Sequence, residues 1–339
     1  MILVTGGTGL VGSHLIYALL KEGAQVRAIH RKGSDLQNVR KVFSYFSTDA
    51  KALFDAIEWV EANIIDIPQL NTVFANITHV YHAAAYVDFN PKNYYKLKKA
   101  NIEGTANIVN LCLAHDVKKL CYVSSIATLG KTIDGTPINE NTHWNPEAKN
   151  SVYAITKYGA EMEVWRGTQE GLDAVIVNPG VILGEGLWHK GSGSIVKRVA
   201  KGLKYYTTGG IGLVDVKDVV SAMKVLMKSD ISNERFILVA ENKTYRNFLT
   251  QLSNALGKKA PYKKLYKWKL IVFSKLDWLA STLFGSKRKL LRTHVASLYT
   301  NDMYDGTKIE RTVDFKYMPF ERTLRRISEH YISDHKRAT

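Results

Sequence analysis

The sequence is poor in cysteine and in long apolar runs. Cys112 and Cys121 are the two thiols among 339 residues, and both stand in apolar stretches. Two thiols cannot build the disulfide framework of a small secreted protein, so we expect buried, unpaired cysteines in a cytoplasmic protein. No run of about 18 uninterrupted apolar residues occurs, which argues against a spanning helix. The glycine motif begins at Gly6, so we expect no targeting peptide before it.

Two common types of catalytic site are also missing. The histidines, such as His14, His30 and His82, show no metal-ligand spacing with carboxylates or thiols, so we expect no metal. A Gly-x-Ser-x-Gly nucleophile elbow is absent, because the nearest string, GSGSI at 191–195, has Gly193 where the serine would stand. These absences argue against metal-dependent and serine-nucleophile chemistry.

What is present is an alternation of two patterns over the first 180 residues. Short runs rich in β-branched residues alternate with amphipathic stretches at Leu10–Glu22, about 94–115 and Val152–Glu170; the runs are MILVT, QVRAIH, HVYHAA, KLCYVSS and DAVIVNP. Continuous apolar runs are typical of strands that are covered on both faces. The alternation predicts an α/β fold with a doubly wound parallel Rossmann-type sheet, whose strands all end at one ligand-binding edge.

The pattern changes after Pro179. Glycines crowd residues 180–193, and strand-like and helix-like segments then follow without a repeat or linker. We therefore predict two interleaved parts. Residues 1–180, with 210–240 returning to them, form a dinucleotide-binding domain, and residues 181–209 and 241–339 form a smaller α/β substrate-binding lobe with a basic C-terminal region.

Three glycines mark the first strand–helix turn. VTGGTGLVG follows a strand and opens a helix, which is the context expected of a dinucleotide-binding turn. Gly6 permits an unusual backbone conformation, Gly9 allows the backbone to approach a pyrophosphate, and Gly12 allows close helix packing. The pyrophosphate would lie at the helix start beside Leu10 and Val11. The spacing Gly-x-x-Gly-x-x-Gly differs from the better known Gly-x-Gly-x-x-Gly.

The second strand indicates which dinucleotide binds. NAD sites carry an acid at the end of this strand, but here the strand ends in His30, Arg31 and Lys32. A guanidinium can hold a phosphate by two hydrogen bonds. We therefore expect NADP, with Arg31 on its phosphate, and keep NAD as the alternative.

A catalytic set follows on the same edge. Tyr153 and Lys157 are four residues apart on a predicted helix and share one face. A nearby ammonium would favour the phenolate and lower the tyrosine pKa towards neutrality. Ser124 and Ser125 end the preceding strand, where a hydroxyl can bind a carbonyl oxygen that gains negative charge. Together these residues predict proton transfer coupled to hydride transfer.

The motifs in this order resemble the extended short-chain dehydrogenase/reductases. They are the glycine turn, HAAA at 82–85, NIEGT at 101–105, SSIATLG, the Tyr-x-x-x-Lys pair and NPGVILG, and they span Met1 to about Glu241. AIHRKGSD, SSIATLG, DGTPINE and ENKTYRNFL are most similar to the dihydroflavonol-reductase-like branch.

The resemblance implies roles for individual residues. Tyr153 would be the general acid, Lys157 its electrostatic partner, and Ser125 the carbonyl-binding serine, with Ser124 as the second candidate. We also expect Ser124, Tyr153 and Lys157 to contact the cofactor, with Lys157 reaching its ribose hydroxyls. Asn101 would hold a proton-relay water, and Asp66 and Ile67 would lie on either side of the adenine. The other implied cofactor contacts are Ala83, Ala84 and Ala85 along the cofactor, and Asn178, Pro179 and Val181 beside the nicotinamide.

Two departures separate the chain from sugar-modifying relatives. Dehydratases of this family carry an Asp-Glu pair after the serine, where this chain has Ile126 and Ala127. Many epimerases have Val-Tyr-Gly where Thr128–Gly130 stand. We therefore expect an NADPH-dependent reductase of a small carbonyl compound. The alternatives are an NAD-dependent sugar-nucleotide epimerase and a non-catalytic cofactor sensor or peripheral membrane scaffold.

Acids are scarce in residues 258–292. This window holds eleven of the Lys and Arg residues and one acid, Asp277, in a chain of net charge +16. Tryptophan, phenylalanine and leucine stand between the cations. Three interpretations are open: a lid or core helix with solvated lysines, peripheral contact with an anionic membrane, and a surface for an acidic substrate or carrier. We expect no nucleic-acid partner, and a homodimer remains a further hypothesis.

Overall fold

Seven parallel strands form the centre of the molecule. The computed structural model describes residues 1–132, 135–284 and 292–336. The sheet has the order β10-β6-β5-β4-β1-β2-β3, and every pairing in it is parallel. Its strands are β1 (Ile2–Thr5), β2 (Val26–His30), β3 (Glu58–Glu61), β4 (His79–His82), β5 (Lys119–Val123), β6 (Ala174–Pro179) and β10 (Glu234–Leu238). The chain order reverses between β1 and β4, and at such a point ligands bind beyond the strand ends.

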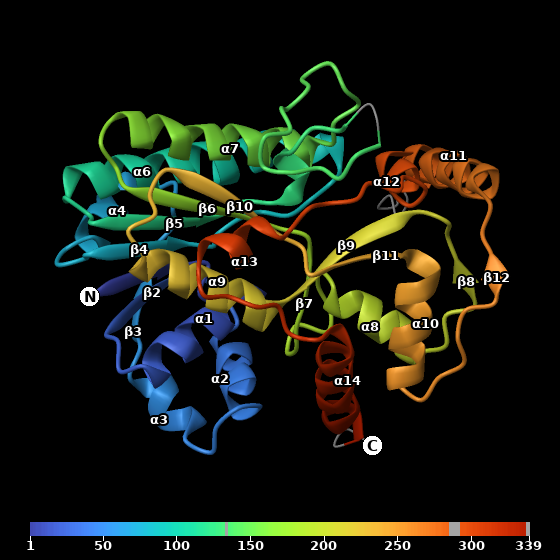
Figure 1. Cartoon of the computed structure of the whole chain (residues 1–339), viewed down its shortest axis with the longest axis horizontal. Coiled ribbons are helices and arrows are strands. Elements are labelled where there is room, and N and C mark those ends of the chain that lie inside the picture. The colour runs from blue at the N-terminus through green and yellow to red at the C-terminus, as the bar shows by residue number, and fades with distance from the viewer. Residues whose placement is uncertain (133–134, 285–291, 337–339) are drawn as a thin grey trace.

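Helices cover both faces of this sheet, as Figure 1 shows. One face carries α4 (Ile67–Val73), α6 (Gly104–Ala114) and α7 (Val152–Gln169). The other carries α1 (Leu10–Lys21), α2 (Leu36–Ser44), α3 (Ala50–Asp55) and α9 (Val216–Lys228). Each face has its own apolar core, because the inner strands alternate buried side chains between the two layers. The predicted doubly wound α/β fold is therefore confirmed.

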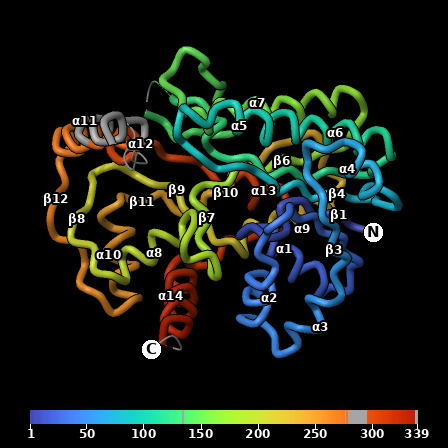
Figure 2. The backbone as a smooth tube through the Cα atoms, turned by 180° about the vertical axis from the view of Figure 1, so that it is seen from behind, coloured from blue at the N-terminus to red at the C-terminus, as the bar shows by residue number. Residues whose placement is uncertain are grey.

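A smaller sheet stands beside the first. Its strands are β7 (Val181–Leu183), β9 (Gly210–Asp215) and β11 (Glu241–Thr244), with β9 in the middle. Around it lie α8 (Gly193–Ala200), α10 (Tyr245–Ala255) and α14 (Phe320–Lys336), which share a third apolar core. Figure 2 shows the small lobe and α14 beside the strand ends of the large sheet.

The remaining elements connect or extend these layers. Before and after α6 lie two 3₁₀ turns, Pro91–Asn93 and Ile126–Thr128, and α5 (Tyr94–Leu97) leads into the π-helical turn Lys98–Glu103. The short strands β8 (Tyr205–Tyr206) and β12 (Lys263–Lys264) pair with each other. The other helices are α11 (Lys267–Phe284), α12 (Arg292–Ser297) and α13 (Lys308–Thr312). The predicted helix over about 94–115 is therefore divided by a π turn into α5 and α6.

Residues 181–240 cross between the two lobes. β9 pairs with β7 and β11 in the small sheet, whereas α9 covers the large sheet and β10 pairs with β6 at its edge. The assignment of residues 210–240 to the dinucleotide-binding domain stays a prediction. In space, the strand at its start lies in the small sheet, and the helix and strand after it lie in the large layer.

The cysteines, the helix lengths and the grouping of possible metal ligands can each be read from the structure. Cys112 and Cys121 are buried and unpaired, as predicted, and burial raises the pKa of both thiols. Within the described ranges, no helix is both long enough and apolar enough to cross a membrane. In the same residues, no three His, Cys, Asp or Glu side chains form a metal-binding group.

Candidate active site

The glycine turn closes tightly over the end of β1. Gly6 has a positive φ of 70°, and a Cβ there would come within 2.7 Å of the Ala83 and Ala84 backbone. A Cβ on Gly12 would lie 2.2 Å from the carbonyl oxygen of Gly6, so the turn requires glycine at both places. Gly9 is the N-cap of α1 and supplies no capping side chain. The first amides at Leu10 and Val11 are therefore available to an anion, which fits a pyrophosphate.

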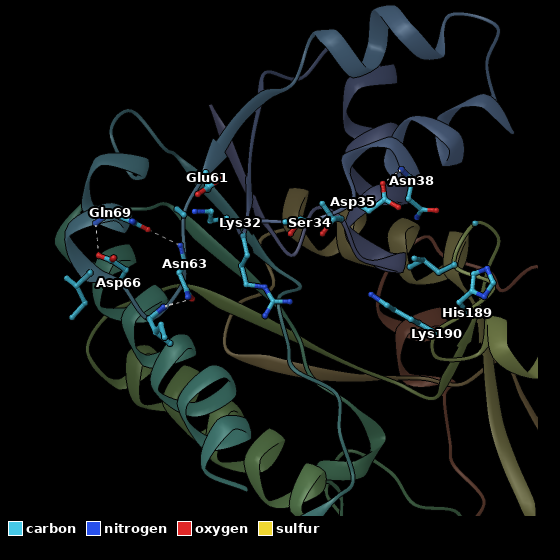
Figure 3. Close-up of a pocket in the computed structure, with 18 of the residues that line it drawn as sticks. Lys32, Ser34, Asp35, Asn38, Glu61, Asn63, Asp66, Gln69, His189 and Lys190 are labelled. Carbon is cyan, nitrogen blue, oxygen red and sulfur yellow. Dashed lines mark hydrogen bonds between the residues drawn. The ribbon is translucent and has the colours of Figure 1, made fainter. Parts of the chain in front are cut away.

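A cleft of about 1090 Å³ opens beside this turn, and Figure 3 shows side chains that line it. Arg31, Lys32, Ser34 and Asn38 line one wall, after β2. Arg31 and Lys32 are both exposed. The residues present therefore fit a phosphorylated adenosine, because two cations stand where an NAD site places an acid.

The predicted adenine residues line the same cleft. Asp66 and Ile67 both border it. Asp66 also caps α4, because its Oδ1 accepts a hydrogen bond of 3.2 Å from the Gln69 backbone amide. Ala83–Ala85 line a smaller adjoining cavity of about 250 Å³. The structure thus brings these predicted cofactor residues to one edge.

Ser125 and Tyr153 meet at the end of β5. Their side chains are hydrogen-bonded to each other, and Ser125 also accepts a hydrogen bond of 3.1 Å from the Ala127 amide. Burial raises the pKa of Tyr153, and the bond to Ser125 partly offsets this rise. Phe89 packs on the tyrosine ring at 5.1 Å between centroids. The pair can therefore present two hydroxyl groups to one carbonyl oxygen.

Lys157 lies one turn further along α7 and is fully buried. Its Nζ donates to the Tyr122 hydroxyl at 2.6 Å and to the Val123 carbonyl at 2.8 Å. Burial lowers the pKa of this amine to about 7, and the charge of Glu161 opposes the decrease. Burial is the largest influence on the pKa of both side chains, and the lowering of the tyrosine pKa by the lysine ammonium stays a prediction.

A buried polar chain runs behind Lys157 to the first strand. Thr5 Oγ1 lies 2.6 Å from His82 Nδ1, and His82 Nε2 lies 3.0 Å from Thr105 Oγ1. Thr105 in turn hydrogen-bonds with Tyr122, the partner of Lys157. Burial lowers the pKa of His82 to about 3, so this ring is neutral at physiological pH. The chain fixes the lysine relative to the glycine-turn strand.

Glu161 is the residue at this site that sequence reasoning missed. Its Oε2 accepts hydrogen bonds from Ser124 at 2.6 Å, Thr128 at 2.8 Å and Asn178 at 2.9 Å. Its Oε1 forms a salt bridge of 3.0 Å with Arg235 from β10. The side chain is fully buried, so one carboxylate joins β5, β6, α7 and β10 beneath the catalytic set. Its position eight residues after Tyr153, on the same helix face, was the available signal.

The side chains of Ser124 and Asn178 both donate hydrogen bonds to Glu161. Ser124 is buried and donates to Glu161, which leaves Ser125 as the serine that meets Tyr153. Asn178 Nδ2 also donates to Thr128, while its Oδ1 is buried without a partner among the described residues. Pro179 and Val181 follow on β6 and β7, at the edge where the two sheets meet. Their contact with a nicotinamide ring stays a prediction.

Asn101 holds a loop rather than contacting the catalytic lysine. It lies in the π turn Lys98–Glu103, and its side chain bonds both to the Tyr86 amide at 2.7 Å and to the Tyr86 carbonyl at 3.0 Å. Its Nδ2 also donates to Thr156 at 3.2 Å, next to Lys157. The predicted proton-relay role stays a prediction, and the observed contacts position the segment after β4.

A glycine-turned Rossmann sheet with Ser, Tyr and Lys at its ligand edge defines the class of extended short-chain dehydrogenase/reductases. Residues 2–239 match the NAD dependent epimerase/dehydratase family, and the chain belongs to this family. It is therefore an NAD(P)-dependent enzyme of the oxidoreductase type, with a Rossmann-type cofactor domain.

The chain is similar to other proteins over most of its length. A tetraketide alpha-pyrone reductase 2 of Arabidopsis thaliana is 29% identical over 69% of this chain and 76% of its own length. A dihydroflavonol 4-reductase of Hordeum vulgare is 23% identical over 90% of this chain and 87% of its own length. The crystal structure of gox2253 superposes with a TM-score of 0.82 at 25% identity, over 98% of each chain.

Proposed function

We propose that the protein is an NADPH-dependent reductase of a small carbonyl compound. One observation carries the proposal: the Ser125 and Tyr153 hydroxyls meet at the ligand edge, one helical turn from the buried Lys157. A hydroxyl pair at this place suits a ketone or aldehyde oxygen. The two relatives named above are reductases, which supports this direction of reaction.

The chain's own residues account for binding and for the proton. Amides at the start of α1 hold the pyrophosphate, and Arg31 holds the adenosine phosphate. Ser125 donates a hydrogen bond to the carbonyl oxygen, and Tyr153 transfers its hydroxyl proton to that oxygen. Lys157, as ammonium, stabilises the phenolate that remains. The bound cofactor supplies the hydride that reaches the carbonyl carbon.

Replacing Tyr153 with phenylalanine tests the reaction. We expect Tyr153→Phe to lower turnover at least roughly 10²-fold, the low end of measured general acid–base contributions, with NADPH affinity kept. Tyr158→Phe is the matched control, because Tyr158 lies on the same helix but stacks on Trp144 at 4.6 Å. Retained turnover in Tyr153→Phe would overturn the proposal. A fall in both variants would point to damage of the helix.

An epimerase is the alternative within the family. Such an enzyme returns its hydride to the substrate and keeps its cofactor, whereas net reduction requires exchange. The purified protein should therefore exchange NADPH freely, and NAD released only on denaturation would favour the epimerase. Binding of NADPH at least roughly tenfold tighter than NADH, about 1.4 kcal/mol, would support the role of Arg31.

The substrate pocket and the cellular site are further parts of the proposal. We assign substrate binding to residues 181–209 and 241–339, of which residues 186–190 line the cleft. We assign a cytoplasmic site to a chain whose two thiols are free. The names of the relatives favour an aromatic or polyketide carbonyl substrate. A screen of NADPH oxidation with aryl, polyketide, sterol and sugar carbonyls would identify the class.

For the basic segment we propose contact with an anionic membrane. In α11, Trp268 is 62% exposed, Phe273 57% and Val272 47%, and helical spacing places them on one outward side with Lys269 and Lys275. A core helix does not account for these exposed side chains. Exposed apolar side chains flanked by lysines suit an interfacial helix. Such a helix binds anionic lipid through burial of its apolar side chains and through electrostatic attraction.

Vesicle sedimentation tests this contact. We expect the protein to sediment with phosphatidylserine-containing vesicles but not with neutral vesicles, and the double variant Trp268→Gln, Phe273→Gln to lose most of this binding. Tyr95→Gln is the control, because Tyr95 is an aromatic residue that is 81% exposed but belongs to α5 and not to the basic helix α11. Wild-type protein that stays in the supernatant with both vesicles would end the proposal.

A further inference from the structure

Residues 184–190 form a loop that carries a cation from the small lobe to the adenosine end of the cleft. The loop follows β7 and precedes α8. Its last residue, Lys190, lines both the large and the small cavity described above, as does Arg31. No other lysine or arginine lines both cavities in the part of the chain that the structure describes. Figure 3 shows Lys190 extending into the cleft from the side opposite Lys32 and Ser34.

Lys190 is exposed, and its ammonium has no partner in the part of the chain that the structure describes. Within residues 1–132, 135–284 and 292–336, its ammonium makes no hydrogen bond or salt bridge with another side chain. The neighbouring Lys197 is different, because it bonds to His189 at 2.8 Å. Two of the acids in the cleft, Asp35 and Asp66, are engaged in capping α2 and α4. The charge of Lys190 is therefore available to a ligand.

The C-terminal helix α14 holds the start of this loop. The fully buried Glu185 accepts a hydrogen bond of 3.1 Å from Arg326 Nε. Burial alone would raise the pKa of Glu185, but His330, Arg326 and His14 outweigh this effect and lower it to about 2. The carboxylate therefore remains charged at physiological pH and keeps its cationic partners.

Trp188 fixes the loop a second time. Its Nε1 donates to Asp334 of α14 at 2.6 Å, and its ring meets Tyr331 edge-on at 5.2 Å. Gly186 has a φ of 101° and packs so closely on Val42 that a Cβ would lie 2.5 Å from its methyl group. The loop is thus fastened to α14 and α2, two residues before Lys190.

We infer that Lys190 is a specificity-determining residue for the cofactor, which grips the adenosine 2′-phosphate from the loop side while Arg31 grips it from the β2 side. A phosphate monoester carries nearly two negative charges at neutral pH, so two cations on opposite walls match it. Trp188 and α14 act as positioning elements for this lysine. The inference rests on the NADP preference in the proposed function.

Binding of adenosine fragments tests the inference without catalysis. Calorimetry would compare 2′,5′-ADP with 5′-ADP on the wild-type protein, on Lys190→Gln and on Lys201→Gln. Lys201 is the matched control, because it is an exposed lysine at the end of α8 that lines neither cavity. We expect Lys190→Gln to weaken 2′,5′-ADP roughly tenfold and 5′-ADP less than twofold, with Lys201→Gln unchanged.

The outcomes separate this inference from the proposed function. Equal 2′,5′-ADP affinity in Lys190→Gln and Lys201→Gln, with a wild-type preference for the 2′-phosphate, would overturn the role of Lys190 alone. A wild-type protein without that preference would overturn the NADP assignment and this inference together, while the Tyr153→Phe result would still decide the reaction.

The loop anchor has its own test. Trp188→Phe keeps an aromatic ring on Tyr331 but removes the indole donor to Asp334. We expect Trp188→Phe to lower the affinity for 2′,5′-ADP a few-fold, which is less than the loss in Lys190→Gln. In the double variant, Trp188→Phe should lower the affinity little beyond the loss that Lys190→Gln causes alone. Full additivity in the double variant would contradict the positioning role.

Discussion

The two ends of the ligand edge are built on opposite electrostatic principles. At the catalytic end, Lys157 and Glu161 are fully buried, and each charge has several hydrogen-bond partners. At the adenosine end, Arg31, Lys32 and Lys190 are exposed to solvent in the cleft. The charges at the first end are paired within the protein, and the cations at the second end are open to a charged ligand.

The difference determines how each end responds to change. Charges interact strongly in a buried, low-dielectric site, and salt hardly screens them. Exposed cations interact weakly with each other and are screened within about 8 Å at physiological ionic strength. Substitutions at the catalytic end should therefore affect both rate and stability, whereas those at the adenosine end should affect only binding.

The largest expected effect is on turnover at the catalytic end. Lys157→Met keeps the length of the side chain but removes the ammonium, and we expect kcat to fall roughly 10²–10⁴-fold. NADPH affinity should change far less. Steady-state kinetics with fluorescence titration of NADPH would measure both, and an unchanged kcat would exclude a catalytic role for the lysine.

The next effect is on stability at the same end. Glu161→Ala leaves Arg235 without its carboxylate beneath the site, and we expect the free energy of unfolding to fall by about 3 kcal/mol. Glu163→Ala is the control, since its pair with Arg166 is about one-third exposed and should cost less than about 1 kcal/mol. Urea denaturation measures both values. Equal losses would show that the buried carboxylate has no special role.

A smaller effect concerns pH. Because burial lowers the pKa of Lys157 to about 7, the ammonium is lost as pH rises through 7. We expect kcat/KM for reduction to be constant below pH 6 and to fall about tenfold per unit above 7. The charge of Glu161 opposes the pKa decrease, so Glu161→Gln should move the fall to lower pH, and Glu163→Gln should not. A flat profile to pH 9 would contradict this assignment.

The smallest expected effect is the response to salt, which should weaken binding at the adenosine end but leave the catalytic end unchanged. Raising NaCl from 0.05 to 0.5 M should reduce the preference for NADPH over NADH roughly threefold, because the cations that hold the 2′-phosphate are exposed. The stability difference caused by Glu161→Ala should hardly change over the same range. A salt-independent cofactor preference would mean that the phosphate is held in a buried site instead.

Sequence reasoning reached the fold because the signals were local. The apolar runs of β1, β2, β4, β5 and β6 and the glycine turn each follow from a few consecutive residues. β3 (Glu58–Glu61) was missed, because this edge strand has acids at both ends and is only half-buried. The helix over about 94–115, which follows β4, was predicted without its π turn, which shifts the register at Asn101.

The site was predictable only where residues lie close in the chain. Tyr153 and Lys157 share α7, and Ser125 follows β5 in the sheet that α7 covers, so motif spacing identified them. Glu161 and Arg235 are 74 positions apart and form a salt bridge, and Arg31 and Lys190 are 159 positions apart and line the same cavities. No spacing rule predicts either arrangement. Their roles depend on how the small lobe returns to the large sheet.

The salt bridge between Glu161 and Arg235 also constrains how the chain folds during synthesis. Ser125, Tyr153 and Lys157 have all left the ribosome long before Arg235 arrives on β10, the last strand of the large sheet. Until then, a buried carboxylate lacks its only arginine partner among the described residues, which disfavours closure of the nascent sheet edge. The large sheet therefore cannot be completed before residues 181–209, the first part of the proposed substrate lobe, are made. A lobe exchanged between relatives would have to bring its own β10 arginine with it.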